Sequence, residues 1–188
     1  CKVMKESMPE LDVRDISDTI EEKQFQYQIS ICSLGRFFRK SIDEFKSNKS
    51  FLRVTNDRFQ KENQKIRCAV SWKSKAGLKS DDKSMNLEQL GNIFKLNNIE
   101  FFNIQYSNED KEIELLKKNS GIEIKKPKNL DKYNDIYGLL KFIDSCDVVL
   151  STSNSNVHLS GALGTPAYLL ILKAYGRLWY WYNDLHGN

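Results

Sequence analysis

The stretch "DVVLSTSNSNVHLSGALGTPAYLLIL", residues 147–172, contains two apolar runs separated by a polar loop and a segment of small residues. The runs "DVVL" (147–150) and "AYLLIL" (167–172) are continuous, as strands buried in a parallel sheet tend to be. We expect a helix over residues 156–163, because Gly164 ends this segment and Pro166 follows it. Strand, helix and strand in this order predict a βαβ unit with a right-handed crossover.

The same alternation of strand and helix patterns begins at residue 66. The apolar periodicity predicts strands at 66–72, 100–105 and 122–124, and helices at 86–96, 109–121 and 135–146. Asn86 and Gln89 have the spacing of a capping box at the start of the first helix. The third helix spaces its expected inward side chains as Ile136, Leu139, Leu140 and Ile143. Together these segments predict an α/β fold with a doubly wound parallel sheet.

The first third of the chain has a different pattern. Residues 1–50 are irregular, and 43–65 are highly polar apart from the apolar group Phe51, Leu52 and Val54. We interpret 1–50 as the end of a preceding lobe, 51–65 as a linker and 66–188 as the sheet domain. The alternative is a single domain with an N-terminal extension. Because the chain starts at Cys1, we expect it to be part of a longer protein.

Composition excludes several classes of protein. The 188 residues carry a net charge of only +4, spread along the chain, so nucleic acid is not an expected partner. Residues 125–128, "KKPK", are interpreted as a solvated loop. No apolar run is long enough to cross a bilayer, and no hydrophobic signal segment is present, so we expect a cytoplasmic protein that is not transmembrane. The scattered cysteines favour reduced thiols over a zinc site or a disulfide framework: Cys1, Cys32, Cys68 and Cys146.

The loop after 147–150 is the first candidate binding site. In an open α/β sheet, ligands bind where the carboxyl ends of strands lead into helix N-termini. There, unpaired backbone N–H groups and the helix dipole favour anions. Donors from the loop and a histidine in the first helical turn would complete a diphosphate site: Ser153, Asn154, Ser155, Asn156 and His158. The alternative is that these side chains only cap the helix and that His158 is a packed, hydrogen-bonded histidine.

Two further strand-end loops should lie at the same edge of the sheet. The loop after the first strand contributes Lys73, Ser74 and Lys83, and the loop after the second contributes Gln105 and Tyr106. Cations in this position suit a nucleotide diphosphate, although a solvated basic loop is the alternative reading. Asn134 and Asp135 precede the third helix and are expected to cap it, or to contact a base or ribose.

Several segments, in order, resemble one family. "AVSWKSK", "MNLEQL", "IEFFNIQY", "YNDIYGLLKFIDSCDVVLSTSNSNVHLSGALGTPAYLLI" and "GRLWYW" resemble the C-terminal lobe of heptosyltransferase-like glycosyltransferases, of the variety fused behind tetratricopeptide repeats. "FQYQISICSLGRFFRKS" resembles the end of the N-terminal lobe in the same proteins. The resemblance implies a GT-B architecture, in which two Rossmann-like, three-layer αβα lobes face each other. The donor is bound mainly by the C-terminal lobe.

The resemblance also implies an activity. Such enzymes transfer a sugar from a nucleotide-diphosphate sugar to an acceptor, here an unknown saccharide, lipid or protein, with neither a metal nor a cofactor. Lys83 matches a phosphate-binding lysine of the family, and Glu109 loosely matches a carboxylate. An Asp-Thr-Gly-like triplet of the family matches Ser153, Asn154 and Ser155, so its carboxylate is missing here. The acid/base residue of the family lies in the N-terminal lobe, and we expect it outside this chain.

The C-terminal tail and the rival functions remain open. Arg177 is placed to reach a phosphate, and Trp179 or Trp181 to stack on a base or sugar, or this tail packs against other protein. Because Ser153 replaces the acidic residue, a non-catalytic scaffold or nucleotide-binding module of a repeat protein is the alternative function. A dinucleotide-dependent oxidoreductase is disfavoured, since the first strand-to-helix loop lacks GxGxxG.

Overall fold

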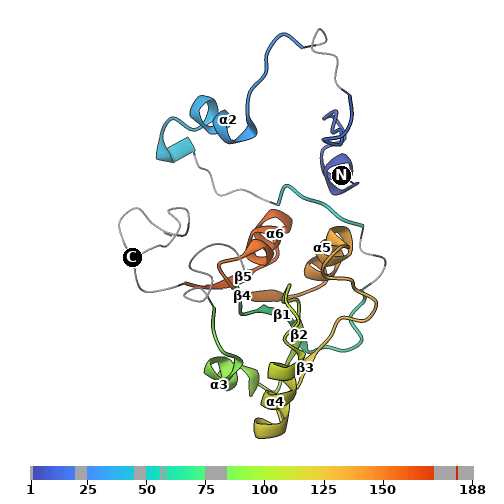
Figure 1. The fold of residues 1–188 in the computed structure, drawn as a ribbon, viewed down its shortest axis with the longest axis vertical. Helices are drawn as coiled ribbons and strands as arrows, with labels where there is room; N and C mark the ends of the chain where they lie inside the picture. Colours follow the sequence, from blue (N-terminus) through green and yellow to red (C-terminus); the bar gives the residue numbers. More distant parts are fainter. Residues whose placement is uncertain are drawn as a thin grey trace.

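The computed structural model describes residues 2–19, 25–44, 50–55, 57, 59–74, 84–171 and 181. Within them, five strands form one sheet in the order β3-β2-β1-β4-β5, and every pairing is parallel (Figure 1). The strands are β1 (Ile66–Ser71), β2 (Ile99–Asn103), β3 (Ile124–Lys125), β4 (Val148–Thr152) and β5 (Ala167–Leu170).

Helices cover both faces of this sheet. From β1 the chain moves outward to β2 and β3, then crosses back to β4 and β5, so right-handed crossovers place the helices of the two halves on opposite faces. Figure 1 shows α3 and α4 on one side of the sheet and α5 and α6 on the other. The predicted doubly wound, Rossmann-like, three-layer fold is confirmed. The helices are η3 (Leu87–Leu90, 3₁₀), α3 (Gly91–Phe94), α4 (Asp110–Ser120), α5 (Ile136–Asp144) and α6 (Ser155–Leu163).

The central strand divides the core into two parts. Cys68, Val70 and Trp72 join the cluster formed with α3 and α4, whereas Ala69 joins the cluster formed with α5 and α6. The Trp72 side chain is completely buried. Burial of a large apolar side chain stabilises a fold by about 1.5–3 kcal/mol. Because successive side chains of β1 point to opposite faces of the sheet, the strand stabilises the packing of both layers of helices.

The helix ends follow from local chemistry. As predicted, Asn86 and Gln89 form a capping box, in which the Asn86 N–H donates to Gln89 Oε1 at 2.9 Å. The helix expected at 86–96 nevertheless begins as the 3₁₀ turn η3. Gly121 follows α4 and Gly164 follows α6, with φ of 70° and 80°. This left-handed conformation is accessible to glycine at little cost and ends both helices.

Three expectations about the sheet and its helices are wrong in detail. The third strand occupies Ile124–Lys125, and Ile122 of the predicted strand 122–124 instead packs into the core before it. The described part of the predicted buried run 167–172 includes an edge strand, β5, in which Tyr168 is 72% exposed, because only β4 pairs with it. Ile136 is 49% exposed because it begins α5, before the turns that lie over the core.

The N-terminal part contains α1 (Lys2–Ser7), α2 (Ile31–Phe38) and the 3₁₀ turn η2 (Ile42–Glu44). Val3 and Met4 of α1 pack against the cluster beneath α5 and α6, whereas α2 has no buried residue. The described part of the predicted linker 51–65 is packed on the sheet domain. Leu52 is buried, and its N–H donates to Ala162 O at 2.9 Å. The predicted division into lobes stays a prediction.

Within the described residues, we find no helix that combines the length and the apolar character needed to span a membrane.

Candidate functional site

The chain changes direction across the sheet between β1 and β4, which are neighbours although they belong to different halves of the sequence. In open α/β sheets the crevice at the carboxyl ends of two such strands is where ligands bind. The loops that leave β1 and β4 form this part of the molecule. We call it the Ser71–Asn154 corner, after the hydrogen bond of 2.8 Å that joins Asn154 Nδ2 to Ser71 Oγ.

Asn154 is the N-cap of α6 and links the two strand ends. Its Oδ1 accepts the N–H of Asn156 at 3.0 Å and the hydroxyl of Ser151 at 3.0 Å. Its Nδ2 donates to Ser71 Oγ and to the carbonyl of Lys73 at 3.3 Å. Both ends of the amide are therefore engaged inside the protein, and Asn154 positions the loops of the corner.

Two other amides of the predicted site also point inward. Gln105 is 2% exposed, and its Oε1 accepts the N–H groups of Trp72 and Lys73 at 2.9 and 2.8 Å. Its Nε2 donates to the carbonyl of Lys73 at 3.1 Å, so Gln105 shapes the loop after β1. Asn156 is buried, and its Nδ2 donates to Ile104 O at 3.1 Å. These amides form hydrogen bonds with buried backbone groups. A buried backbone group without a hydrogen bond would destabilise the fold by about 1–3 kcal/mol.

The outer surface of the first turn of α6 is formed by Ser155 and His158, both exposed. Trp181 lies against this turn. Its Nε1 donates to Ser153 Oγ at 2.9 Å, and the centroids of its ring and of the His158 imidazole are 4.7 Å apart. Partial burial lowers the pKa of His158, so the imidazole is largely neutral at pH 7. The corner thus presents hydroxyls, an imidazole and an indole around a helix N-terminus.

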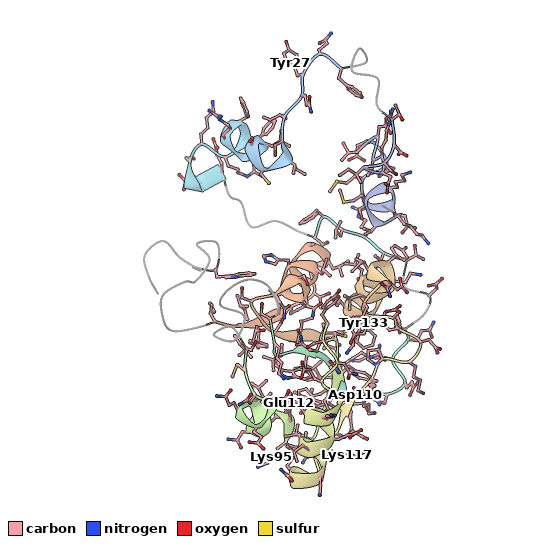
Figure 2. The ribbon with its side chains drawn as sticks, in the orientation of Figure 1. Tyr27, Lys95, Asp110, Glu112, Lys117 and Tyr133 are labelled. Carbon is pink, nitrogen blue, oxygen red and sulfur yellow. The ribbon has the colours of Figure 1, made fainter. Side chains whose placement is uncertain are left out.

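The ammonium group of Lys73, beside the corner, forms ion pairs with two carboxylates. It pairs with Glu109 Oε2 at 2.6 Å and with Glu112 Oε2 at 2.7 Å. Burial alone would lower the pKa of Lys73, but hydrogen bonding to these two carboxylates outweighs it and raises the pKa. Glu112, labelled in Figure 2, also accepts the indole N–H of Trp72 at 3.1 Å. Ser74 is buried, and its N–H donates to Ser84 Oγ at 3.1 Å.

Tyr106 is exposed and packs edge to face against Tyr133, with 5.3 Å between ring centroids. Figure 2 labels Tyr133, which lies in the loop before α5. This loop and the loop after β2 are thus brought together. The capping alternative for Asp135 is confirmed, since its Oδ1 accepts the N–H of Gly138 at 2.7 Å. Lys83, Arg177 and Trp179 lie outside the described residues.

Two of these side chains, Glu112 and Tyr133, were not predicted from the sequence. Glu112 follows Glu109 by one helical turn, and this i, i+3 spacing is the signal that both carboxylates face the same way. Tyr133 had no comparable signal, because only the folded sheet brings its loop to Tyr106.

Comparisons with known proteins add one partial relationship. No family model matches the chain, and no solved structure matches it. Protein FlbA of Caulobacter vibrioides is similar to it, with 34% identity over 70 residues. This match covers 37% of the present chain and 12% of FlbA. The chain therefore spans only a small part of this relative.

Proposed function

We propose that the sheet domain binds the nucleotide-diphosphate sugar of a glycosyltransferase of the heptosyltransferase-like GT-B type, within a cytoplasmic protein that also contains tetratricopeptide repeats. The observation that supports this proposal best is the Ser71–Asn154 corner at the switch point between β1 and β4. There the N-terminus of α6 meets exposed hydroxyl and imidazole groups.

The chemistry of sugar transfer explains what such a corner would do. When the glycosidic bond to the donor breaks, negative charge develops on the nucleoside diphosphate that leaves. Donors held rigidly around the leaving group stabilise that charge. The α6 dipole, the Ser155 hydroxyl and the imidazole of His158 would supply these donors. The caps and buried amides keep them in place, because Asn154 and Gln105 fasten the loops from within.

Isothermal titration with ADP, UDP and GDP and with their sugars tests the donor site. We expect saturable binding of at least one nucleoside diphosphate, without dependence on added divalent metal. His158→Ala should weaken it by about 1–3 kcal/mol, because a hydrogen bond to a charged group is lost. Lys117→Ala is the matched control, since Lys117 lies exposed in the last turn of α4. If none of the nucleotides binds, or if His158→Ala binds as tightly as the parent, the proposed site is wrong.

A second candidate function is a non-catalytic nucleotide-binding module or scaffold. It is favoured by the engagement of Lys73 with Glu109 and Glu112, which leaves the charge of this lysine compensated within the protein. The loss of the family's carboxylate at Ser153 points the same way. Binding of a nucleotide sugar without its hydrolysis or transfer by the whole protein would support this function. Release of nucleoside diphosphate during incubation with donor and acceptor would contradict it.

A further inference from the structure

A cleft of about 580 Å³ lies against the α5 face of the sheet and shares no residue with the Ser71–Asn154 corner. Its presence follows from the topology, since α6 lies on β4 and β5 and α5 packs beside α6. The same face of β2 and β3 is bordered instead by the segment before β1 and by the loop after β3 (Figure 1). Pockets for small molecules commonly measure about 300–1,000 Å³, so the cleft has the size of a ligand site.

The floor of the cleft is aromatic. Phe102 of β2 lies edge to face with Phe142 of α5 at 5.4 Å, and Phe59 lies edge to face with Phe142 at 5.2 Å. All three rings line the cleft; Phe142 is buried and Phe102 is half-buried. Arg67 and Lys125 lie over the ring of Phe102, at 5.6 and 5.9 Å from its centroid. The ring therefore offers a ligand an apolar surface bordered by positive charge.

A buried cation forms part of the wall. Arg67 is 7% exposed, and its terminal nitrogens donate to the carbonyls of Phe59 and Gln60 and to the hydroxyl of Ser145, at 2.8–3.1 Å. Among the described residues, no group accepts a hydrogen bond from its Nε. These acceptors are all neutral. The carboxylate of Asp147 accepts the backbone N–H of Arg67 at 2.7 Å and pairs with Lys61, so it compensates the guanidinium charge only from a distance. A buried charge in this state favours an anion beside it.

Three lysines form the rim of the cleft, and each pairs with a carboxylate. Lys125 pairs with Glu100 at 2.6 Å, and Lys126 pairs with Asp110 at 2.7 Å. Lys128 pairs with Glu62 at 3.5 Å, and both side chains are about four-fifths exposed. Such surface pairs stabilise a protein by only about 0–1 kcal/mol, so Lys128 can exchange this partner for the acidic group of a ligand.

The geometry points to a binding site for a small planar organic acid in this cleft. The apolar body of the acid packs on Phe102, and its acidic group lies between Arg67 and Lys128. This site is independent of the donor site proposed above. It also changes the interpretation of residues 125–128, which line a cleft and not only a solvated loop.

Benzoate is the probe for a test by nuclear magnetic resonance of the isotope-labelled whole chain. We expect saturable shifts of the amide signals of Arg67, Phe102 and Lys128, with dissociation on the order of millimolar for so small a ligand. Benzyl alcohol has the same aromatic ring without the carboxylate and should bind about 5-fold more weakly than benzoate. Acetate, which has the carboxylate but lacks the ring, should also bind about 5-fold more weakly.

Charge reversal at the rim separates this site from general attraction to a basic protein. Lys128→Glu should weaken benzoate binding by about 3–10-fold. Lys118→Glu, a change at an exposed position in the last turn of α4 outside the cleft, should leave it unchanged. Both positions are on the surface, so neither change threatens folding. Absence of shifts in the cleft, equal binding of benzyl alcohol, or equal loss in the two variants would overturn the proposal.

Discussion

At the scale of single residues, the polar side chains around the corner divide into two groups. Asn154, Gln105 and Asn156 face inward and satisfy backbone groups of neighbouring loops, whereas Ser155 and His158 face outward. The first group determines stability and the shape of the loops. The second is the group that a ligand can reach.

This division predicts different effects for two neighbouring substitutions. Asn154→Ala removes the N-cap of α6 and the link to Ser71, and should lower the free energy of unfolding by about 1–3 kcal/mol. Ser155→Ala changes an exposed side chain and should alter it by no more than about 0.5 kcal/mol. Urea denaturation followed by circular dichroism measures both. Equal effects would mean that Asn154 is not engaged as described.

The imidazole of His158 should report on ligands and on pH. Because burial lowers its pKa in the folded state, the unfolded chain takes up this proton first as the pH falls. His158 should therefore reduce stability as the pH drops below about 6.5, until the folded imidazole is itself protonated. A bound diphosphate favours the imidazolium and should raise the pKa of His158.

Proton resonance titration of the imidazole measures this pKa with and without ADP or UDP. The variant His158→Gln identifies the signal and should remove its share of the acid destabilisation. A His158 pKa above the ordinary value in the free protein, or one that a bound diphosphate leaves unchanged, would contradict the prediction.

At the scale of elements, helix ends are fixed by glycines in the left-handed conformation, but their surroundings differ. A Cβ at Gly121 would meet no atom within 4 Å, whereas one at Gly164 would lie 3.0 Å from the Cβ of Ser50. The end of α6 is therefore packed against the segment that precedes β1, and the end of α4 is open.

Alanine at the two positions should separate backbone strain from packing. Gly121→Ala should cost about 1–2 kcal/mol, which is the strain of a left-handed alanine. Gly164→Ala should cost more, because Ser50 or α6 must also move. Thermal and urea unfolding of the two variants give the comparison. A smaller loss for Gly164→Ala than for Gly121→Ala would show that Ser50 does not press on this turn.

At the scale of the whole molecule, the sheet separates two apolar layers, and each contains a buried cysteine. Cys68 belongs to the layer with α3 and α4, and Cys146 to the layer with α5 and α6. Burial raises the pKa of both thiols to about 12, whereas Cys32 is exposed on α2.

Alkylation therefore tests both layers in one experiment. At pH 8, iodoacetamide should modify Cys32 quickly in the native protein, because the thiol is accessible. Cys68 and Cys146 should react only as the protein unfolds, and peptide mass spectrometry over time distinguishes the three. Rapid labelling of Cys68 or Cys146 alone would show that the corresponding layer of helices is not packed as described.

Much of this architecture could be predicted because it depends on neighbours in the chain. Continuous apolar runs, helical spacing, the Asn86 capping box and glycines after helices are all local, and they determined the α/β class, the order of the elements and the parallel sheet. The errors fell where burial depends on a neighbour across the sheet, as for Tyr168 on the edge strand. The loop after β4 was also recognised from its sequence alone as a helix N-terminus at the carboxyl edge of the sheet.

The tertiary structure alone decided what each polar side chain of the corner contacts. Asn154 binds Ser71 across 83 positions, Gln105 closes a loop more than 30 positions away, and Lys73 pairs with Glu112 of α4. The cleft beside Arg67 likewise combines segments that are distant in the chain. Hydrogen bonds and ion pairs are short-ranged in space but independent of distance along the chain, so periodicity in the sequence carries no record of them.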